Sequence, residues 1–433
     1  MIKIKAVITA GGKGTRIASL QPDIPKPMIK ILGKPILEYQ IDCLKKYGIT
    51  DIILVVGYLS GKIKDYFGNG EKFGVCIDYW TETEPLGSAG ALFKIQGRLT
   101  EDFLFINGDI VFDIDFPRFI EFYKTKKAFA ALLIHPNSHP FDSSLLVTDK
   151  DERVIKWLNK DDEREIYKNQ VNAGIHIVSK RLLGLIKVES EKLDFDRDII
   201  KPNIERCGIY AYNTTEYVLD MGTPERLGKA ARDIERGFVV KKNLSLKQKA
   251  FFLDRDGTIN KTNGFVRRAE DFELIEGVAE SIKKINDSGC LAIVITNQPV
   301  IARGGCTLEE LDRIHQKLET ELGKKGAYID ALYFCPHHPD KGFEGEIAEY
   351  KIDCGCRKPK PGMILAAAKK FNIDLSLSYM VGDSFRDWGA GLAAGCKSVF
   401  LSRGVDIKTL PRPTPKEVLV FDNLKDFMDS VDL

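Results

Sequence analysis

The chain has 433 residues, of which 44% are hydrophobic and 29% charged, and its formal net charge is +2 at pH 7. At about 150 residues per domain, this length predicts two or three domains with sizeable cores. The balanced composition excludes a disordered, collagen-like or small disulfide-rich chain. A nearly neutral charge argues against a nucleic-acid partner, but it allows a local basic pocket for a small phosphorylated ligand.

The start of the sequence runs from Met1 directly into a strand-like stretch, without the apolar region or cleavage site of a signal peptide. No apolar run approaches the roughly 18 residues that a membrane-spanning helix needs. We therefore expect a cytoplasmic protein with no membrane partner. Its nine cysteines are then expected to be free thiols rather than disulfides. A homo-oligomer is compatible with the sequence, which leaves the oligomeric state open.

Short apolar stretches alternate with helical patterns in the first half of the chain. The strands predicted there are 4–9, 51–56, 103–106, 128–134 and 174–178, and the helices include 36–47 and 224 to about 236. This alternation is typical of an α/β domain with a mostly parallel sheet covered on both faces. The polar and basic residues 237–249 predict a linker after a domain of residues 1–236.

The same alternation resumes at residue 250 and predicts a second domain, residues 250–433. Its predicted strands are 250–253, 291–295, 331–334, 379–381 and 398–401, and its predicted helices are 278–288, 308–322 and 363–371. Both halves are therefore expected to be doubly wound α/β domains. They share no motif, so the chain is not an internal repeat.

A glycine-rich turn, Gly11-Gly-Lys-Gly-Thr-Arg16, follows the first predicted strand. Glycines let the backbone approach an oxyanion closely, and consecutive N–H groups together with lysine and arginine offset its charge. The spacing fits neither the Walker A motif nor the dinucleotide-binding fingerprint. Taken alone, the turn is equally compatible with a purely structural role.

Four further motifs follow in the same half: Pro25-Lys-Pro-Met28, Asn107-Gly-Asp109, Asn172-Ala-Gly174 and Asp220-Met-Gly-Thr-Pro224. Each alone could be an ordinary turn or helix cap. In this order they make residues 1–236 resemble the sugar-1-phosphate nucleotidyltransferases. That family implies an open α/β sheet and the attack of a sugar 1-phosphate oxygen on the α-phosphate of a nucleoside triphosphate, which releases pyrophosphate.

The resemblance also implies roles for particular side chains. Catalysis needs fixed cations around the reacting phosphorus, and Arg16 and Lys26 are implied to bind the transferring phosphates. Asp109 and Asp220 are implied to hold Mg²⁺, a cation that prefers oxygen ligands. The implied nucleotide-binding residues are Gly11, Gly12, Gly14, Thr15, Glu82, Gly87 and Asn107, and those implied at the sugar phosphate are Asn172, Gly174 and Lys160.

One departure from this family concerns the sugar site. The family usually has Glu-Lys after the sugar-binding loop, whereas this chain has Asn159-Lys160. Lys160 can still bind the sugar phosphate, but an amide replaces the carboxylate that normally binds sugar hydroxyls. The sugar identity of the common hexose enzymes is therefore not transferred to this chain.

The second half opens with Asp254-Arg-Asp-Gly-Thr258 directly after a predicted strand. Two carboxylates two residues apart on an extended chain point the same way, which suits a nucleophile beside a proton donor. Alone, the motif could also be a Ca²⁺-binding turn or a helix cap. Thr296-Asn297, Arg357-Lys358 and Gly382-Asp383 follow in order, and residues 250–402 thereby resemble the haloacid-dehalogenase (HAD) phosphatases.

This second resemblance implies that Asp254 attacks the phosphate to form an aspartyl-phosphate. Asp256 would protonate the leaving alkoxide and then act as base for the hydrolytic water. Mg²⁺ would be held by Asp254, Asp383 and the backbone carbonyl of Asp256. The residues implied to bind phosphate or substrate are Thr296, Asn297, Arg303, Arg357 and Lys358.

Cys335, His337, Cys354 and Cys356 offer four soft or borderline ligands, which predicts a tetrahedral structural Zn²⁺ site. His338 is an alternative to His337, and buried thiols with surface histidines are the alternative to a metal site. Since Cys356 directly precedes Arg357, closing this loop around a metal would position the cations of the phosphate site.

Together these motifs resemble the subgroup of heptose 1,7-bisphosphate 7-phosphatases and histidinol-phosphatases, although Pro299-Val300 stands where Ser-Gly is usual. Removing the distal phosphate of a sugar 1,7-bisphosphate leaves a sugar 1-phosphate, the acceptor for the other half. The fusion therefore favours synthesis of a nucleotide-activated heptose from heptose phosphates and a nucleoside triphosphate. The resemblance favours GTP, through the α-anomer route to GDP-heptose. The base, the anomer and transfer of intermediate between the domains stay open.

Two alternatives remain. One is a hexose-1-phosphate nucleotidyltransferase, for example one acting on mannose 1-phosphate, whose phosphatase half acts on another metabolite. The other is a non-enzymatic chain in which one half is a regulatory or scaffolding module. The intact carboxylate sets of both halves argue against the second.

Overall fold

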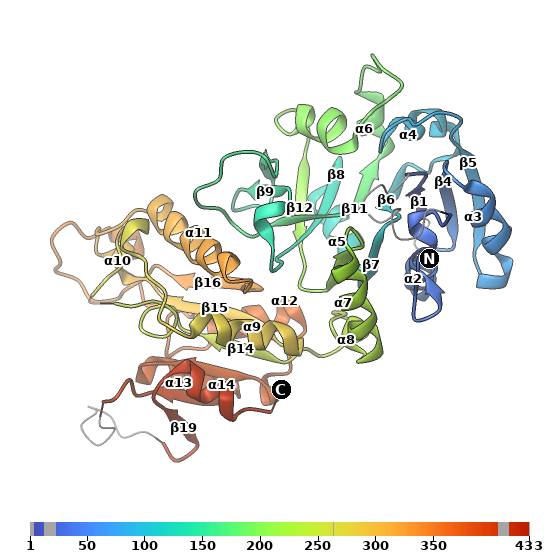
Figure 1. The fold of residues 1–433 in the computed structure, drawn as a ribbon. Helices are drawn as coiled ribbons and strands as arrows, with labels where there is room; N and C mark the ends of the chain where they lie inside the picture. The colour runs from blue at the N-terminus through green and yellow to red at the C-terminus, as the bar shows by residue number, and fades with distance from the viewer. Residues whose placement is uncertain (1–3, 13–22, 263, 406–414, 433) are drawn as a thin grey trace. The chain divides into compact units, whose positions relative to one another are not determined.

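The computed structural model describes residues 4–12, 23–262, 264–405 and 415–432, which form two compact units (Figure 1). The first unit comprises Met1–His135, Ser144–Asn159 and Gln170–Asn243. The second unit comprises Pro136–Ser143, Lys160–Asn169 and Leu244–Leu433.

The first unit is built on one large mixed sheet, ordered β10-β9-β11-β6-β1-β4-β5, with β8 pairing to β11 and β12. Its strands are β1 (Lys5–Ala10), β4 (Asp51–Val56), β5 (Cys76–Thr81), β6 (Asp102–Asn107), β8 (Ala130–His135), β9 (Leu145–Thr148), β10 (Val154–Leu158), β11 (Val171–Ser179) and β12 (Ile209–Asn213). Pairing is parallel through β5, β4, β1 and β6 and antiparallel at β11, β9 and β10. The predicted strands of this half are confirmed.

Helices cover both faces of this sheet. They are α2 (Ile36–Lys46), α3 (Ser60–Phe67), α4 (Gly90–Lys94), α5 (Phe116–Lys126), α6 (Lys180–Gly184), α7 (Pro224–Glu235) and α8 (Phe238–Lys241). Successive strand side chains point to opposite faces, and in β1 Ala6 and Ile8 enter one core cluster while Val7 enters another. Helices α2, α3 and α5 pack in the first cluster and α4 and α6 in the second. Because both faces of the sheet are covered, side chains on both sides of each inner strand are apolar, and these strands appear in the sequence as continuous apolar runs.

Two small antiparallel sheets complete the first unit. β7 (Ile110–Asp113) pairs with β13 (Tyr217–Asp220), and β2 (Lys30–Ile31) pairs with β3 (Lys34–Pro35). The register of the first pair places Asp220 opposite Ile110. The pairing of β7 with β13 therefore places the end of β13 next to the turn that follows β6.

The second unit has a six-stranded parallel sheet ordered β16-β15-β14-β17-β18-β19. The strands are β14 (Ala250–Leu253), β15 (Leu291–Asn297), β16 (Ala331–Cys335), β17 (Tyr379–Gly382), β18 (Lys397–Leu401) and β19 (Val418–Phe421), and the helices are α9 (Val278–Ser288), α10 (Pro299–Ala302), α11 (Leu308–Lys324), α12 (Gly362–Phe371), α13 (Phe385–Ala394) and α14 (Leu424–Ser430). Helices α9, α11 and α14 pack on one face and α12 and α13 on the other. This is the predicted doubly wound fold, and its strand order reverses between β14 and β17, where such folds bind ligands.

The boundary between the two units differs from the predicted linker at 237–249. Helix α8 occupies part of that segment, and Asn243 and Leu244 are buried. Asn243 donates a hydrogen bond to Asp113 at 2.6 Å, so its polar side chain is used inside the first unit. The units divide between Asn243 and Leu244. The polar composition of residues 237–249 predicts a linker, but it does not reveal that some of these residues make specific contacts within a unit.

Two segments from the first half of the chain belong to the second unit, where they pack on helix α11. The backbone N–H of Tyr167 donates to the Thr320 hydroxyl at 2.9 Å, and that of Asn169 donates to the Glu319 carboxylate at 2.6 Å. Burial raises the pKa of Glu319 to about 7. These segments, Pro136–Ser143 and Lys160–Asn169, were predicted to lie within the first domain; the structure groups them with the second unit instead.

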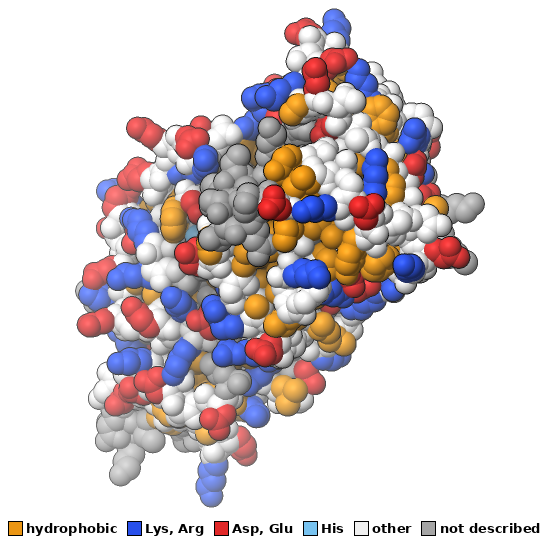
Figure 2. Space-filling view, turned by 45° about the vertical axis from the view of Figure 1, so that its right-hand side comes forward, with side chains coloured by type: hydrophobic (Ala, Val, Ile, Leu, Met, Phe, Trp, Pro, Cys, Tyr) orange, Lys and Arg blue, Asp and Glu red, His pale blue; other side chains and the backbone are white. Residues whose placement is uncertain are grey.

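Acidic and basic side chains are interspersed on the face drawn in Figure 2, as the nearly neutral net charge predicts. Within the described part of the chain, no helix combines the length and apolarity that crossing a membrane would require.

Candidate active sites in the two units

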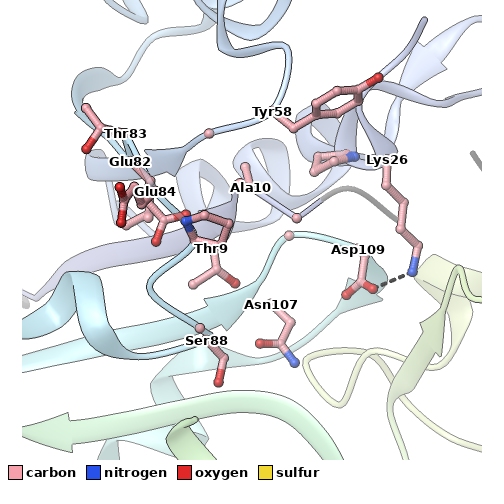
Figure 3. A pocket seen from close by; sticks show the side chains of 18 residues that line it. Thr9, Ala10, Lys26, Tyr58, Glu82, Thr83, Glu84, Ser88, Asn107 and Asp109 are labelled. Atoms are coloured by element: carbon pink, nitrogen blue, oxygen red, sulfur yellow. Dashed lines mark hydrogen bonds and ion pairs between the residues drawn. The ribbon is translucent and has the colours of Figure 1, made fainter. Parts of the chain in front are cut away.

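The first unit contains a cavity of about 850 Å³ at the carboxyl ends of β1, β4 and β6 (Figure 3). Its lining residues are Thr9, Ala10, Gly11, Gly12, Lys26, Pro27, Val55, Gly57, Tyr58, Glu82, Thr83, Glu84, Pro85, Gly87, Ser88, Asn107, Gly108 and Asp109. Ligands of open α/β sheets bind at this edge. Of the predicted nucleotide-binding residues, Gly11, Gly12, Glu82, Gly87 and Asn107 line this one cavity.

The close approach of β1 and β4 at the cavity requires glycine at position 11. A Cβ atom on Gly11 would lie 2.6 Å from Glu82 Oε2 and 3.2 Å from the backbone nitrogen of Gly57. The first distance is shorter than packed atoms allow and the second is unusually tight, so a side chain here would displace Glu82 from the cavity wall. The glycine predicted for phosphate binding therefore also makes room for a carboxylate.

Glu82 is a partly buried acid whose Oε1 has no hydrogen-bond partner among the described residues. Burial raises the pKa of its carboxyl, against a hydrogen bond from the backbone N–H of Leu86. Leaving a buried oxygen unpaired costs about 1–3 kcal/mol. In Figure 3 Glu82 lies at the opposite end of the view from Lys26 and Asp109. The cavity therefore has an acceptor-rich end and a separate cationic end.

At that cationic end, Lys26 Nζ lies 2.5 Å from Asp109 Oδ2. The backbone N–H of Met221 donates to the Asp109 carbonyl at 2.8 Å, which brings the end of β13 to this turn. Asp220, the residue before Met221, accepts hydrogen bonds of 2.6 Å from Arg226 on α7. The two predicted magnesium-binding carboxylates thus come from adjacent chain segments, although only Asp109 lines the cavity.

The structure does not test every predicted residue of this site. Gly14, Thr15 and Arg16 lie outside the described residues. Lys160 belongs to the second unit, while Asn159 accepts a hydrogen bond from Lys201.

Asn172 and Gly174 do not line the cavity but stand directly behind it. Gly174 has φ +70°, and a Cβ there would lie 2.5 Å from Asn107 Nδ2. Sequence reasoning missed the lining residues Thr9, Tyr58, Thr83, Glu84 and Ser88. Ser88 belongs to Gly87-Ser-Ala-Gly90, which resembles the family's base-recognition loop, whereas the other four carry no motif of their own and lie at or near strand ends.

The second unit contains a cavity of about 200 Å³ at the carboxyl ends of β14, β15 and β17. Its lining residues are Asp254, Asp256, Thr262, Gly264, Phe265, Thr296, Asn297, Pro299, Arg357, Lys358, Asp383, Ser384, Arg386 and Asp387. All the predicted phosphatase residues except Arg303 lie here. Arg303 instead stacks over the rings of Phe343 and Phe265, at 4.3 and 5.3 Å from their centres.

Lys358 is a buried cation at the centre of this cavity. Its Nζ lies 2.7 Å from Asp254 Oδ1 and 2.5 Å from Asp387 Oδ1, and it donates to the Ile295 carbonyl at 2.7 Å. Burial and the charge of Asp387 raise the pKa of Asp254 to about 7, and Lys358 opposes them. A lysine in this position offsets the negative charge of the carboxylates and of any phosphate that enters.

Asp256 is held by a different set of partners. Arg255, which is fully buried, donates to it at 2.9 Å, Gln298 Nε2 at 2.8 Å and Asn260 Nδ2 at 3.0 Å. Burial raises the pKa of Asp256, but the Arg255 guanidinium and these hydrogen bonds outweigh it, so the pKa lies below the ordinary value. The free protein therefore keeps Asp256 as a carboxylate that can accept a proton.

Asp254, Asp383 and Asp387 bring carboxylate oxygens within 4.8 Å of one another. Such a group of oxygen ligands fits a hard divalent cation. Gly257 has φ +83°, and a Cβ there would lie 1.9 Å from Asp383 Oδ2, so only glycine lets the loop pass this carboxylate. Asp387 was not assigned to the metal site from the sequence, but its carboxylate belongs to this group. The side chain of Asp256 does not belong to it.

The thiol cluster forms as the spacing predicted. Cys335 Sγ lies 3.5 Å from Cys354 Sγ and 3.6 Å from His337 Nδ1, and Cys356 Sγ lies 3.1 Å from Cys354 Sγ and 3.5 Å from His337 Nδ1. Tetrahedral zinc with its usual bond lengths separates such atoms by about 3.5–3.8 Å. The cluster therefore has the donor set and the size of a metal site.

His338 lies apart from this cluster, since its Nδ1 accepts a hydrogen bond from the backbone N–H of Asp340 at 3.2 Å. Arg357 links the cluster to the cavity. Its Nη1 donates to the His337 carbonyl at 3.0 Å, and Arg357 also lines the cavity beside Lys358.

Comparisons with known proteins match a different family to each half of the chain. A family model described as nucleotidyl transferase matches residues 5–237, and one described as HAD-hydrolase-like matches residues 355–427. The chain is 42% identical over 154 residues to a D-glycero-β-D-manno-heptose-1,7-bisphosphate 7-phosphatase of Yersinia pestis, covering 36% of this chain and 80% of the relative. The corresponding phosphatase of Escherichia coli (strain K12) is 40% identical, with 36% and 78% covered.

Among solved structures, HddC from Yersinia pseudotuberculosis is 29% identical and covers 53% of this chain and 99% of its own, with a TM-score of 0.48. A D,D-heptose 1,7-bisphosphate phosphatase from B. bronchiseptica, complexed with magnesium and phosphate, is 32% identical and covers 42% and 97%, with a TM-score of 0.37. The family match over residues 5–237 and the phosphatase relatives together establish a two-part enzyme. The chain belongs to the nucleotidyl transferase family and, through its HAD-type part, to the family of the heptose-bisphosphate phosphatases.

Proposed function

We propose that the chain performs two successive reactions of heptose activation. The second unit removes the 7-phosphate of D-glycero-D-manno-heptose 1,7-bisphosphate. The first unit then transfers GMP from GTP to the heptose 1-phosphate, which gives GDP-heptose and pyrophosphate. The observation that carries this proposal is the presence of both parts in one chain, because the product of a 7-phosphatase is the acceptor that a sugar-1-phosphate nucleotidyltransferase uses. Since GTP is a cytoplasmic substrate, we place both reactions in the cytoplasm.

In the phosphatase reaction, a carboxylate oxygen of Asp254 attacks the phosphorus of the 7-phosphate. The bond from phosphorus to the sugar oxygen breaks, and Asp256 gives its proton to that oxygen. Water then attacks the phosphorus of the aspartyl-phosphate while Asp256 accepts its proton, which releases phosphate, restores Asp254 as a carboxylate and returns Asp256 to its protonated form. The first step needs protonated Asp256, a form that the negative charge of the arriving phosphate favours. Lys358, Thr296 and Asn297 hold the phosphate oxygens.

Mg²⁺ would be held by Asp254 and Asp383, with Asp387 close to both. Three acidic side chains whose oxygens approach within 4.8 Å fit such a cation. When bound, it would offset the charge that otherwise repels an anionic nucleophile from a phosphate ester.

In the transfer reaction, an oxygen of heptose 1-phosphate attacks the α-phosphorus of GTP, and the bond to the bridging oxygen of the β-phosphate breaks. Lys26 and Arg16 stabilise the charge that develops on the phosphate oxygens. Asp109 and Asp220 are carboxylates from adjacent segments and suit a second Mg²⁺. The ion pair of Lys26 with Asp109 keeps the lysine at this end of the cavity until phosphates arrive.

The choice of GTP is supported by the chemistry of Glu82. Guanine presents two neighbouring N–H donors, N1 and the 2-amino group, which a carboxylate can accept together. Adenine, cytosine and uracil present no two adjacent donors on their pairing edge. A buried carboxylate oxygen without a partner at the end of the cavity away from Lys26 therefore suits guanine best.

Replacing Glu82 by glutamine is expected to lower kcat/KM for GTP by about 10- to 100-fold, because the variant loses a charged acceptor and gains a donor that faces guanine donors. The preference for GTP over ATP should narrow accordingly, as rates with each nucleoside triphosphate would measure. Glu84→Gln is the matched control, because Glu84 is an exposed acid on the same cavity wall. A loss in the Glu84 variant alone would move the base contact away from Glu82.

We further propose that Cys335, His337, Cys354 and Cys356 hold a structural Zn²⁺. A closed set of three thiolates and one imidazole leaves no open position for substrate. Its contribution would be to fix the loop that ends in Arg357 and Lys358.

Cys354→Ser is accordingly expected to abolish stoichiometric zinc binding and to lower phosphatase activity by about tenfold or more, since weakened ligation frees the loop that carries Lys358. Nucleotidyl transfer should be unaffected. Elemental analysis of the purified protein and the two activity assays measure these effects. Cys290→Ala, which removes a buried thiol of the same unit outside the cluster, serves as control. Full zinc content in the Cys354 variant would contradict the assignment.

The proposed function itself is tested with the full chain, Mg²⁺, each anomer of heptose 1,7-bisphosphate and all four nucleoside triphosphates, with products identified by mass spectrometry. GDP-heptose from one anomer would support both reactions and their order. The phosphatase relatives are named for the β-anomer, so both anomers are essential. Phosphate release without a nucleotide sugar would support the phosphatase reaction but would reject heptose 1-phosphate as the acceptor of the first unit. Equal activity on mannose 1-phosphate would favour a hexose enzyme.

A further inference from the structure

A second cluster of polar side chains lies in the first unit, next to the cavity but outside its lining. Asp196 lies in the helical turn Phe195–Ile200, and the side chain of Asn172 donates to its two carboxylate oxygens at 3.4 and 3.5 Å. Lys201, which follows that turn, donates to the side-chain oxygen of Asn159. The cluster therefore joins the predicted sugar-site residue Asn172 to the position where the family's usual carboxylate is missing.

Two residues of the cavity wall connect this cluster to the cavity. Ser88 lines the cavity, donates its hydroxyl to Asp194 at 3.0 Å and accepts a hydrogen bond from the Phe195 N–H at 2.8 Å. Asn107, also in the wall, packs against Gly174, whose N–H donates to Asn172 at 3.2 Å. Asp196 and Asn172 thus stand immediately behind the wall that separates them from the nucleotide cavity.

Asp196 is a half-buried acid with few hydrogen-bond partners. Burial and the neighbouring Asp194 raise its pKa to about 7, against the charge of Lys201 and the Asn172 amide. Among the described residues, its hydrogen bonds come from Asn172 alone. A carboxylate can accept about four, so Asp196 keeps acceptor capacity that the described residues do not use. Such a group beside a cavity is characteristic of a binding site.

We propose that Asp196 is the carboxylate that accepts hydrogen bonds from the hydroxyls of the sugar 1-phosphate, in place of the one that Asn159 does not supply. This inference rests on the proposed function of the first unit. A glutamate at position 159 would pair with Lys201, but a neutral amide leaves the charge of that lysine to be balanced by Asp196. Compared with the family's usual Glu-Lys, the negative charge of the sugar site lies at position 196 instead of position 159. Sugar hydroxyls supply the donors that Asp196 lacks.

The test uses Asp196→Asn in the full chain, assayed for transfer with GTP and heptose 1-phosphate. We expect KM for the sugar phosphate to rise by about 10- to 100-fold, as for the loss of charged hydrogen bonds. KM for GTP and the phosphatase activity should stay within twofold of the parent. The double variant Asp196→Asn/Asn159→Glu should recover part of the loss, because it returns a carboxylate beside Lys201.

Glu191→Gln is the matched control, because it removes an exposed carboxylate of the same chain segment that pairs with Lys94 at 2.5 Å. It should leave every constant unchanged. Equal rises in both KM values, or an unchanged KM for the sugar phosphate, would overturn the proposal and leave Asp196 a structural residue that holds Asn172.

If Asp196→Asn does not fold, deoxy analogues of heptose 1-phosphate test the parent protein instead. Loss of the hydroxyl that Asp196 binds should raise KM by a similar factor for one analogue, and no effect for any analogue would overturn the proposal. Failure of the parent protein to use any sugar 1-phosphate would reject the proposed function. An active parent with an unchanged Asp196 variant would reject only this inference.

Discussion

Asp254→Asn is expected to lower phosphatase turnover by about 10⁴-fold or more, while transfer from GTP to heptose 1-phosphate continues at the parental rate. The amide that replaces the carboxylate cannot attack phosphorus, so no aspartyl-phosphate forms. The substitution is close to isosteric, and Lys358 keeps its second acidic partner, Asp387, at 2.5 Å. Phosphate release from the bisphosphate and nucleotide-sugar formation from the monophosphate, measured separately, give the two rates.

Asp353→Asn is a suitable control for this experiment, because Asp353 is an exposed acid of the same unit that pairs with Lys360 at 2.6 Å. It should retain both activities. Loss of both activities in the Asp254 variant would mean that the two sites do not work independently. Retained phosphatase activity would remove Asp254 from the role of nucleophile.

Asp220→Ala is expected to lower nucleotidyl transfer by about 10²- to 10³-fold and to leave phosphate release unchanged. The variant loses a carboxylate proposed to hold Mg²⁺ and leaves Arg226 without the partner it contacts at 2.6 Å. Loss of one electrostatic group from a phosphoryl-transfer site commonly has an effect of this size. Rates at increasing Mg²⁺ concentration would measure it, and the variant should need more Mg²⁺ than the parent.

Glu225→Ala provides the comparison, since Glu225 is an exposed acid in the first turn of the same helix, α7. Its transfer rate and Mg²⁺ requirement should match those of the parent. An Asp220 variant with a normal Mg²⁺ requirement but a lower melting temperature would indicate that the Asp220–Arg226 pair serves stability instead.

The sheets and the phosphatase site could be predicted from the sequence because their signals are local. The apolar run of β14 ends directly at Asp254, and the close pairs around Cys335 and Cys354 predict a cluster of metal-binding side chains, although spacing alone left the choice between His337 and His338 open. Strand β19 was not predicted. It is a four-residue edge strand, and its Leu419 and Val420 are 46% and 39% exposed, so it lacks the continuous buried run that marks the inner strands.

Other parts of the sites depend on contacts between distant residues. Asp387 forms a capping box with Ser384, a local role that explains its position without any site. Its approach to Lys358 is visible only in the folded unit. Asp196 carries no motif, and its partial burial follows from the packing of the turn 195–200 behind Ser88. Such residues are found from distances and burial rather than from spacing.

The assignment of residues 136–143 and 160–169 to the second unit has a consequence for the order in which parts of the chain fold during synthesis. Tyr167 and Asn169 bond to residues 153 and 150 positions further along the chain, on α11. At about 5–20 residues per second, a ribosome needs roughly 8–30 s to add that length. The strands of the first unit can pair during this interval, but these two segments wait for their partner helix. A ribosome that stalls before α11 would therefore leave both segments open to proteases and chaperones.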